Sequence, residues 1–464
     1  MRPSRRVLVF AACATLGSAP MPAVAQSAAR LVRTEPYPAV RLPADIWVDR
    51  GADGYWALIR RPDDSQVFMR GQMLEAQFRK LRRESLSVEP ISGRPIFYAI
   101  GDAGDLIVGR DGPVALPEPM TTELAFRPLF AGTAMVPIYT SGKVGEFRLH
   151  VGTKVGPVSG DPPASATDAS GALVAQTYSQ GGKTYVVMPD GATKGPFESA
   201  SSLKVSPDGT RTGFAFRRDG KLYIDLAGHE FGGWSQQLGA VIANSVTNFV
   251  APVSEADGEF VVTATARYGP FPTGNNAIVV SDSGSRYAFL VPREGDLWAV
   301  QTETGVGPVA KLIAEMRYSP SERHFAYYGR DPNSRYLVVY DGKPTVSKDP
   351  LDPLSFRFGA DDRLLFVTRK GEQTNKPGDD RTTLYVDGAK SLTIRGLASL
   401  VATAPQGQPV FLEGGLARLT IGSRAVDLSK HCDSIYIAHV RLLETAARLF
   451  CRKGADLNLV EVPY

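Results

Sequence analysis

Cysteine and histidine are scarce in this sequence of 464 residues, which contains three cysteines and five histidines. No two histidines are four residues apart, and none belongs to an H-E-x-x-H motif, so the sequence predicts no zinc site. The run His431-Cys432-Asp433 combines three types of metal ligand, but a structural role is the favoured interpretation. The histidines are His150, His229, His324, His431 and His439.

Motifs of catalysis and of nucleotide binding are also missing. The sequence has no G-x-S-x-G nucleophile elbow, no calcium loop, no P-loop and no dinucleotide fingerprint. The carboxylate pairs Asp361-Asp362 and Asp379-Asp380 would serve acid–base catalysis only if they folded into a central funnel, and solvated turns are favoured. We therefore predict no catalytic, cofactor-binding or metal-binding residue and no cofactor, and an enzyme is the less favoured class.

A strong excess of one charge and long apolar runs are missing as well. The net charge is only +4, which gives no reason to expect a nucleic-acid partner. No later segment has eighteen uninterrupted apolar residues, so we expect no transmembrane segment once the N-terminus is removed.

The N-terminus has the pattern of an export signal. Arg2, Arg5 and Arg6 precede the apolar run 7–17, and Ala23-Val-Ala25 matches a cleavage site. We predict a signal peptide over residues 1–25, cleavage after Ala25 and a periplasmic or secreted protein. The twin arginines leave open whether export follows the general or the twin-arginine route.

Two cysteines remain after this cleavage. Cys432 and Cys451 would close a loop of about twenty residues, worth roughly 3 kcal/mol in the chain-entropy model. An oxidising compartment permits a disulfide bond, and two separate buried thiols are the alternative.

The most informative segment that is present runs from Tyr185 to Tyr223. Short apolar stretches in it alternate with Asp-Gly and Pro-Asp-Gly turns, which is typical of successive antiparallel strands. Its turn Ser206-Pro-Asp-Gly209 recurs along the chain. Related turns start at Asp168, Ser281 and Ser319, so the intervals are 38, 75 and 38 residues, and the long one spans two units.

A second marker has nearly the same period. A glycine ends the third strand of each unit from Gly71 to Gly422, in steps of 34 to 46 residues. In the turns, Ser or Asp can cap nearby N–H groups, Pro presets φ, and Gly accepts a positive φ at the fourth position. Four short strands in each unit of about 38 residues indicate an all-β fold, a β-propeller of four-stranded antiparallel blades.

The repeats predict the domain organisation. Residues 26–44 should be a linker, and residues 45–464 should hold ten or eleven units, in one large ring or in two rings that divide near residue 150. Because the last unit lacks a fourth strand, we expect an N-terminal strand to close the ring. The first candidate is Val40–Val48, and the second, if a ring of eight units stands alone, is a segment near residues 145–158.

The Ser-Pro-Asp-Gly turns between aromatic-rich strands resemble the TolB-like β-propeller repeat. Similar blades belong to prolyl oligopeptidases and tricorn-type proteases. The resemblance is strong over residues 165–345 and loose over residues 45–464. It implies the fold and says little about function.

One segment departs from the repeat. Residues 73–84 contain good helix formers and the basic side chains of Arg79, Lys80, Arg82 and Arg83. These four residues are candidates for docking an acidic partner or a membrane surface. A short helix or a long strand with a solvated basic face is the alternative.

Two functions fit this sequence. The favoured one is a non-catalytic platform in the cell envelope that binds a protein or peptide of unknown identity. The other is a lyase or hydrolase acting on glycans or peptides, with residues from several blades gathered in the central funnel. A funnel with three or more convergent His, Tyr, Arg or carboxylate groups would favour the enzyme, and an exposed apolar rim would favour the platform.

Overall fold

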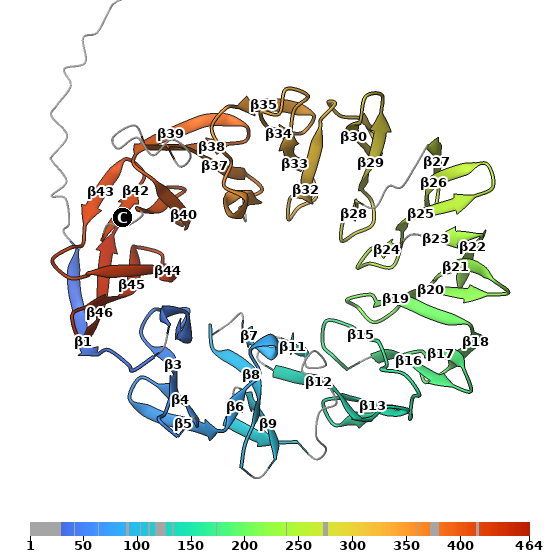
Figure 1. Cartoon of the computed structure of the whole chain (residues 1–464), viewed down its shortest axis with the longest axis horizontal. Helices are drawn as coiled ribbons and strands as arrows, with labels where there is room; N and C mark the ends of the chain where they lie inside the picture. The colour runs from blue at the N-terminus through green and yellow to red at the C-terminus, as the bar shows by residue number, and fades with distance from the viewer. Residues whose placement is uncertain are drawn as a thin grey trace, which may run out of the picture.

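The chain forms one ring of β-sheet blades (Figure 1). The structure is a computed structural model that describes residues 29–464 except 41, 64, 90–91, 103, 110–111, 117–126, 132–133, 173, 238, 272–276, 360, 372–379 and 414–416. These residues form eleven antiparallel sheets that follow one another around the ring. The predicted propeller is therefore confirmed, and the larger of the two expected unit numbers is correct. The predicted signal peptide lies outside the described residues.

The blades are numbered along the chain, and their strands are given from the centre of the ring outward. The first four blades contain β2 (Ile46–Val48), β3 (Tyr55–Arg60), β4 (Gln66–Arg70) and β5 (Met73–Phe78) in blade 1; β6 (Lys80–Leu81), β7 (Ser87–Val88), β8 (Pro95–Ile100), β9 (Asp105–Gly109) and β10 (Gly112–Ala115) in blade 2; β11 (Arg127–Ala131), β12 (Ala134–Lys143), β13 (Glu146–Val151) and β14 (Lys154–Val155) in blade 3; and β15 (Ser165–Thr167), β16 (Val174–Gln180), β17 (Lys183–Val187) and β18 (Thr193–Phe197) in blade 4.

The next four blades contain β19 (Ser199–Val205), β20 (Thr212–Arg218), β21 (Lys221–Leu226) and β22 (His229–Trp234) in blade 5; β23 (Gln236–Gln237), β24 (Val241–Ile242), β25 (Phe249–Glu255), β26 (Gly258–Thr263) and β27 (Arg267–Phe271) in blade 6; β28 (Ile278–Val280), β29 (Tyr287–Arg293), β30 (Leu297–Thr302) and β31 (Gly305–Val306) in blade 7; and β32 (Leu312–Tyr318), β33 (Phe325–Arg330), β34 (Tyr336–Tyr340) and β35 (Lys343–Ser347) in blade 8.

The last three blades contain β36 (Arg357–Phe358), β37 (Leu364–Lys370), β38 (Arg381–Val386) and β39 (Ala389–Arg395) in blade 9; β40 (Ala398–Thr403), β41 (Pro409–Glu413), β42 (Arg418–Ile421) and β43 (Arg424–Asp427) in blade 10; and β44 (Ser434–Leu442), β45 (Ala446–Lys453), β46 (Asp456–Pro463) and β1 (Arg30–Pro36) in blade 11. Short 3-10 turns are η1 (Pro43–Asp45), η2 (Arg83–Ser85) and η4 (Pro353–Ser355). No helix in the described part of the chain is long and apolar enough to cross a membrane.

An N-terminal strand closes the ring, as expected, but it is a different strand from the predicted one. β1 pairs antiparallel with β46 and completes blade 11 (Figure 1). The first candidate, Val40–Val48, is wrong because Ile46–Val48 forms β2, the innermost strand of blade 1. The second candidate falls in blade 3. Residues 26–44 are also not only a linker, since they include β1.

The repeated turns have the predicted geometry. The amide of Gly209 donates to the carbonyl of Ser206 at 2.8 Å, and Gly209 has a φ of 73°. The hydroxyl of Ser206 accepts a hydrogen bond from the amide of Arg211 at 2.9 Å. Ser281 and Ser319 cap the amides of Arg286 and His324 in the same way. The turn chemistry of the sequence therefore acts as expected.

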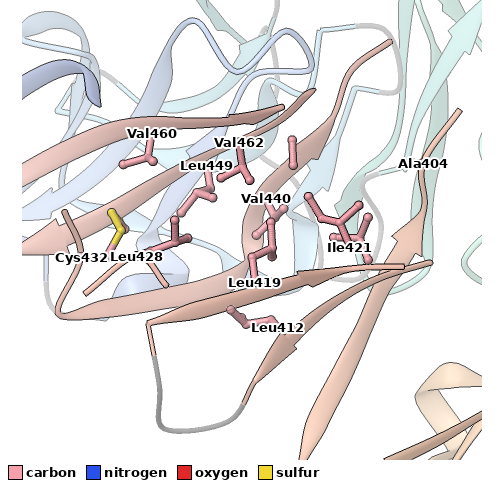
Figure 2. Packing of buried hydrophobic residues seen from close by; sticks show 13 residues of the cluster. Ala404, Leu412, Leu419, Ile421, Leu428, Cys432, Val440, Leu449, Val460 and Val462 are labelled. Carbon is pink, nitrogen blue, oxygen red and sulfur yellow. A yellow bond between two sulfur atoms is a disulfide. The ribbon is translucent and has the colours of Figure 1, made fainter. Parts of the chain in front are cut away.

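The hydrophobic core lies between the blades. Figure 2 shows Leu412 and Leu419 of blade 10 packed against Val440, Leu449 and Val460 of blade 11. A similar cluster joins blade 11 to blade 1 across the closure of the ring. Strands that are covered on both faces by neighbouring sheets need apolar residues on both sides, which explains the continuous apolar runs of the second strands.

Residues 73–84 contain no α-helix. Met73–Phe78 forms β5, the outermost strand of blade 1, which pairs with β4. The strand interpretation of this segment is therefore correct, because pairing with β4 overrides the helix propensity of the side chains.

Candidate functional site

The innermost strands line the centre of the ring (Figure 1), and they are irregular in most blades. In blades 1, 2 and 9 a 3-10 turn interrupts or precedes the strand. In blades 5, 8, 10 and 11 the pairing of the innermost strand with the second strand shifts register. Such bulges redirect side chains and are frequent at functional sites. We call these 3-10 turns and register shifts the inner-wall excursions.

Large apolar side chains are exposed at these excursions. Leu354 in η4 is 90% exposed, and Leu42, directly before η1, is 49% exposed. Tyr436 and Ile437 in β44 are 41% and 37% exposed. We call these four residues the apolar wall residues. Single exposed apolar side chains are ordinary, but these four lie in or directly beside the inner-wall excursions of three blades.

The largest register shift is in β44. Ile435 pairs with Cys451, but the next pair is Val440 with Leu449, so residues 436–439 lie opposite Phe450 alone. The extra residues must bend away from the ladder, because one partner cannot pair with four. Tyr436 and Ile437 are therefore presented on the exposed side of the strand.

This excursion is held in place at both ends. Cys432, two residues before β44, forms a disulfide bond with Cys451 of β45, and the two Cα atoms are 5.5 Å apart. At the other end of the excursion, Nε2 of His439 lies 3.1 Å from the carbonyl oxygen of Pro43 and 3.2 Å from that of Ile46. Arg441 donates to the carbonyl of Val48 at 2.7 Å. The exposed segment is thus fixed to its own blade and to blade 1.

His439 should make the seam between blades 11 and 1 sensitive to pH. Burial lowers the pKa of His439, and Arg441 beside it acts in the same direction. In the unfolded chain this histidine takes up a proton near pH 6.5, whereas in the folded protein it stays neutral at that pH. The free energy of unfolding is therefore highest above this pH and decreases as the pH falls. We expect thermal unfolding between pH 5 and 8 to show this loss, and His439→Gln, which keeps an N–H donor but does not titrate, to reduce it. An unchanged pH profile in the variant would contradict this assignment.

The four basic residues suggested for docking do not form one free face. Arg79 pairs with Asp102 at 2.7 Å, and Arg83 pairs with the buried carboxylate of Asp45 at the start of blade 1. Lys80 is exposed at the start of β6. Arg82 lies between β6 and η2 and is half-buried. Two of the four side chains therefore connect elements of the fold.

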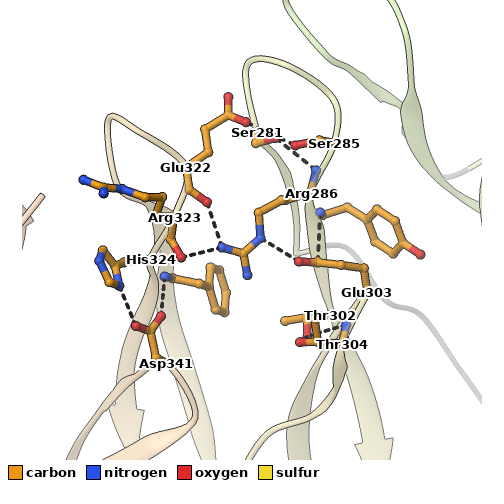
Figure 3. A network of polar contacts seen from close by, with 12 residues as sticks. Ser281, Ser285, Arg286, Thr302, Glu303, Thr304, Glu322, Arg323, His324 and Asp341 are labelled. Atoms are coloured by element: carbon orange, nitrogen blue, oxygen red, sulfur yellow. Dashed lines mark hydrogen bonds and ion pairs between the residues drawn. The ribbon is translucent and has the colours of Figure 1, made fainter.

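A charged network lies between blades 7 and 8 (Figure 3). Arg286 donates to Glu303 at 2.6 Å and to the carbonyl of Glu322, in the turn of the next blade, at 2.7 Å. Nδ1 of His324 lies 2.6 Å from Asp341. The network borders a cavity of about 380 Å³, also lined by Arg323. Seen alone, a histidine oriented by an aspartate beside a cavity could act as a general base.

The repeat indicates a structural role for this histidine. Asp341 also accepts a hydrogen bond from the amide of Phe325 at 2.9 Å, so it joins the end of the third strand to the start of the second. A carboxylate connects the same two strands in blade 7, where Glu303 binds the Arg286 side chain and the Tyr287 amide. We call this arrangement, in which one carboxylate binds a basic side chain and the next backbone amide, the carboxylate latch. It occurs again in blade 9, where Asp387 binds the Arg363 side chain and the Leu364 amide. His324–Asp341 is therefore one copy of a repeated strand connection.

These carboxylate latches were not among the features predicted from the sequence. Their signal is present, because a basic residue precedes the second strand and an acidic residue ends the third strand in each of these blades. Arg286 and Glu303 are 17 residues apart, as are His324 and Asp341. Comparison of the units at these two positions would have found them.

The other suggested polar residues do not gather. Asp362 accepts from the amide of Ser321 at 2.9 Å and pairs with Arg323, so it connects the turns of blades 8 and 9. Asp379 lies outside the described residues. Asp433 pairs with Lys453. Within the described ranges, no group of three or more His, Cys, Asp or Glu residues is placed to hold a metal ion.

No family model matches the chain, and no curated protein matches it. Among solved structures, the chain is similar to dihydro-heme d1 dehydrogenase NirN in complex with DHE, at 10% identity over 80% of this chain and 78% of that chain, with a TM-score of 0.31. It is also similar to TolB from Acinetobacter baumannii, at 15% identity over 44% and 57%, with a TM-score of 0.24. A third is the β-propeller domain of the Trilobed protease from Pyrococcus furiosus, at 9% identity over 55% and 80%, with a TM-score of 0.27. These likenesses are too low to support a functional argument.

Proposed function

We propose that the protein is a non-catalytic binding platform of the cell envelope, and that the inner wall of its ring binds a segment of a partner protein or peptide. The supporting observation is the set of apolar wall residues. Full burial of an exposed side chain of this size contributes about 1.5–3 kcal/mol, and Leu354, at 90% exposure, is nearest to that case. The location in the envelope rests on the export signal in the sequence. We also propose that the repeat is of the TolB-like type, on the basis of its Ser-Pro-Asp-Gly turns.

The anchoring of β44 supports binding at this site. A segment that is fixed before binding loses little conformational freedom when a partner covers it. Tyr436 packs edge-on against the ring of His439 at a centroid distance of 5.2 Å, and His439 is itself held by blade 1. Tyr436 and Ile437 therefore offer preorganised apolar contacts, which is the usual property of binding hot spots.

Affinity capture from periplasmic extract tests this function. We expect the native protein to retain a protein or peptide partner, and a variant with Leu354→Asp and Ile437→Asp to lose it, because a partner would have to desolvate two carboxylates. Both side chains are exposed, so the variant should fold. Leu74→Asp with Val346→Asp is the matched control, because these residues are exposed on the outermost strands β5 and β35.

Two outcomes would contradict the proposal. One is a partner that is retained equally by the inner-wall variant and the outer-strand control. The other is recovery of a soluble glycan with no protein or peptide partner, which would favour an enzyme.

A further inference from the structure

A pocket lies on the inner wall of the ring, where the innermost strands of three consecutive blades end. Its volume is about 380 Å³. It is lined by the ends of β28 in blade 7 and β32 in blade 8, by the turns that follow these two strands (Figure 1), and by Phe358 of β36 in blade 9. Phe358 comes four residues after Leu354, which is one of the apolar wall residues. The pocket therefore continues the surface to which the proposed function assigns the partner segment.

Apolar side chains line this pocket. Val280, Met316 and Phe358 belong to the lining, and each is half-buried. Met316 comes two residues after Ala314, the extra residue at the register shift of β32. Such a bulge changes the direction of the side chains beside it. We call Val280, Met316 and Phe358 the apolar lining, and it can contact the aliphatic part of a bound side chain.

The edge of the pocket carries two carboxylates whose hydrogen-bond donors are neutral. Asp282 accepts a hydrogen bond from the side-chain amide of Asn244 at 2.6 Å. Glu322, which is drawn in Figure 3, accepts one from the backbone amide of Ser283 at 2.7 Å. Neutral donors do not cancel the charge of a carboxylate. We call Asp282 and Glu322 the pocket carboxylates.

The basic side chains of the surrounding strands and turns pair with other carboxylates. Arg317 is itself part of the lining, and it donates to Glu315 at 2.6 Å. Two further arginines are paired in the same region, and these pairs are Arg286–Glu303 and Arg323–Asp362. Because these charges cancel in pairs, the pocket carboxylates leave an excess of negative charge, which favours a cation.

We propose that this pocket binds the side chain of a lysine or arginine in the partner segment, with its methylene groups on the apolar lining and its charged end at the pocket carboxylates. The pocket has this role only if the proposed function is correct, since the partner segment must lie on the inner wall to reach it. Long basic side chains commonly cover apolar surface with their methylene groups while the charged end stays in a polar environment. The partner segment thus combines apolar residues for the wall with a basic residue for the pocket.

Nuclear magnetic resonance of the methionine methyl groups tests the pocket in the whole protein. The chain has eight methionines, and Met316→Leu identifies the Met316 signal in protein labelled with carbon-13 at these methyl groups. The probes are acetyl-Leu-Lys-Leu-amide and the same peptide with norleucine or glutamate in the middle. Norleucine keeps the methylene groups of lysine and removes its charge. We expect the lysine peptide to shift the Met316 signal saturably and to bind roughly three to five times more tightly than the norleucine peptide, as for one exposed ion pair.

Substitution of the pocket carboxylates should remove this preference. Glu322→Gln and Asp282→Asn should each reduce the preference for lysine and leave the affinity for the norleucine peptide unchanged. Both substitutions keep a side-chain oxygen that can accept the existing hydrogen bond, so the variants should fold. The matched control is Glu444→Gln, because exposed Glu444 has the second position in the corresponding turn of blade 11, as Asp282 has in blade 7. This control should keep the full preference.

Four results would overturn the proposed pocket. They are no response of Met316 to the lysine peptide at concentrations on the order of 10 mM, equal affinity for the lysine and norleucine peptides, a preference for the glutamate peptide, and a lysine preference that both carboxylate variants retain. The peptides replace the native partner, so any of these results together with successful affinity capture would overturn the pocket and leave the platform. Lysine selectivity at Met316 together with failed capture would contradict only the platform.

Discussion

Replacing Phe450 by alanine should destabilise the closure of the ring by about 3–5 kcal/mol, the usual effect of removing a buried phenylalanine. Phe450 is buried in β45, and its ring packs edge-on against Tyr55 of blade 1 at a centroid distance of 5.4 Å. Ile46, Val48 and Leu459 complete this cluster between blades 11 and 1. Hydrogen exchange should show faster opening in these two blades, and thermal unfolding should begin at a lower temperature.

Phe289→Ala is the matched control for this variant. Phe289 is equally buried, but it belongs to the cluster between blades 6 and 7. We expect a similar loss of stability with faster exchange in blades 6 and 7. If Phe450→Ala had no local effect on blades 1 and 11, the cluster that joins them would not hold the ring closed.

Removal of residues 1–36 should open the ring and cause self-association. This deletion takes away β1, whose residues Arg30–Pro36 pair with β46, and it also removes the ion pair between Arg30 and Glu461. Each backbone hydrogen bond lost contributes about 1 kcal/mol, and β46 becomes a free edge strand that can pair with another chain. We expect dimers and larger species by native mass spectrometry and a lower unfolding temperature.

Removal of residues 1–29 is the control, because it leaves β1 complete. This shorter deletion should remain monomeric to the same extent as the native protein. Equal behaviour of the two deletions would contradict a closing role for β1. Addition of a synthetic peptide with the sequence of residues 29–38 should reverse the association of the longer deletion if pairing with β46 is the cause.

The four-stranded blade and its repeat could be predicted because the signals are local. A strand is recognised from four to eight residues, and a turn such as Ser206–Gly209 from four, since each side chain acts on its own backbone. The repeat then multiplies these signals, so one correct unit predicts the others. The outcome at residues 73–78 shows the limit of this reasoning, because helix propensity is overridden when a neighbouring strand supplies the hydrogen bonds.

The closing strand could not be identified in this way. β1 is almost entirely exposed because it is the outermost strand of blade 11, so it carries no alternating apolar pattern. The candidate Val40–Val48 contains apolar residues that suit an inner strand, and Ile46 and Val48 are buried in β2. The partner of β1 lies more than four hundred residues away, and no local signal encodes that distance.

The candidate sites depend even more on tertiary structure. Leu42, Tyr436 and Ile437 are ordinary apolar residues in sequence, and they become a surface only because a 3-10 turn and a register shift meet at the seam of the ring.

By itself, the sequence determined the all-β fold, the turn chemistry and the repeat of about 38 residues, because these depend on contacts between near neighbours. The tertiary structure alone decided the single ring of eleven blades, the identity of the closing strand and the exposure of the apolar wall residues. These features depend on the residues that meet after closure, when each blade has packed against the next and the last blade against the first.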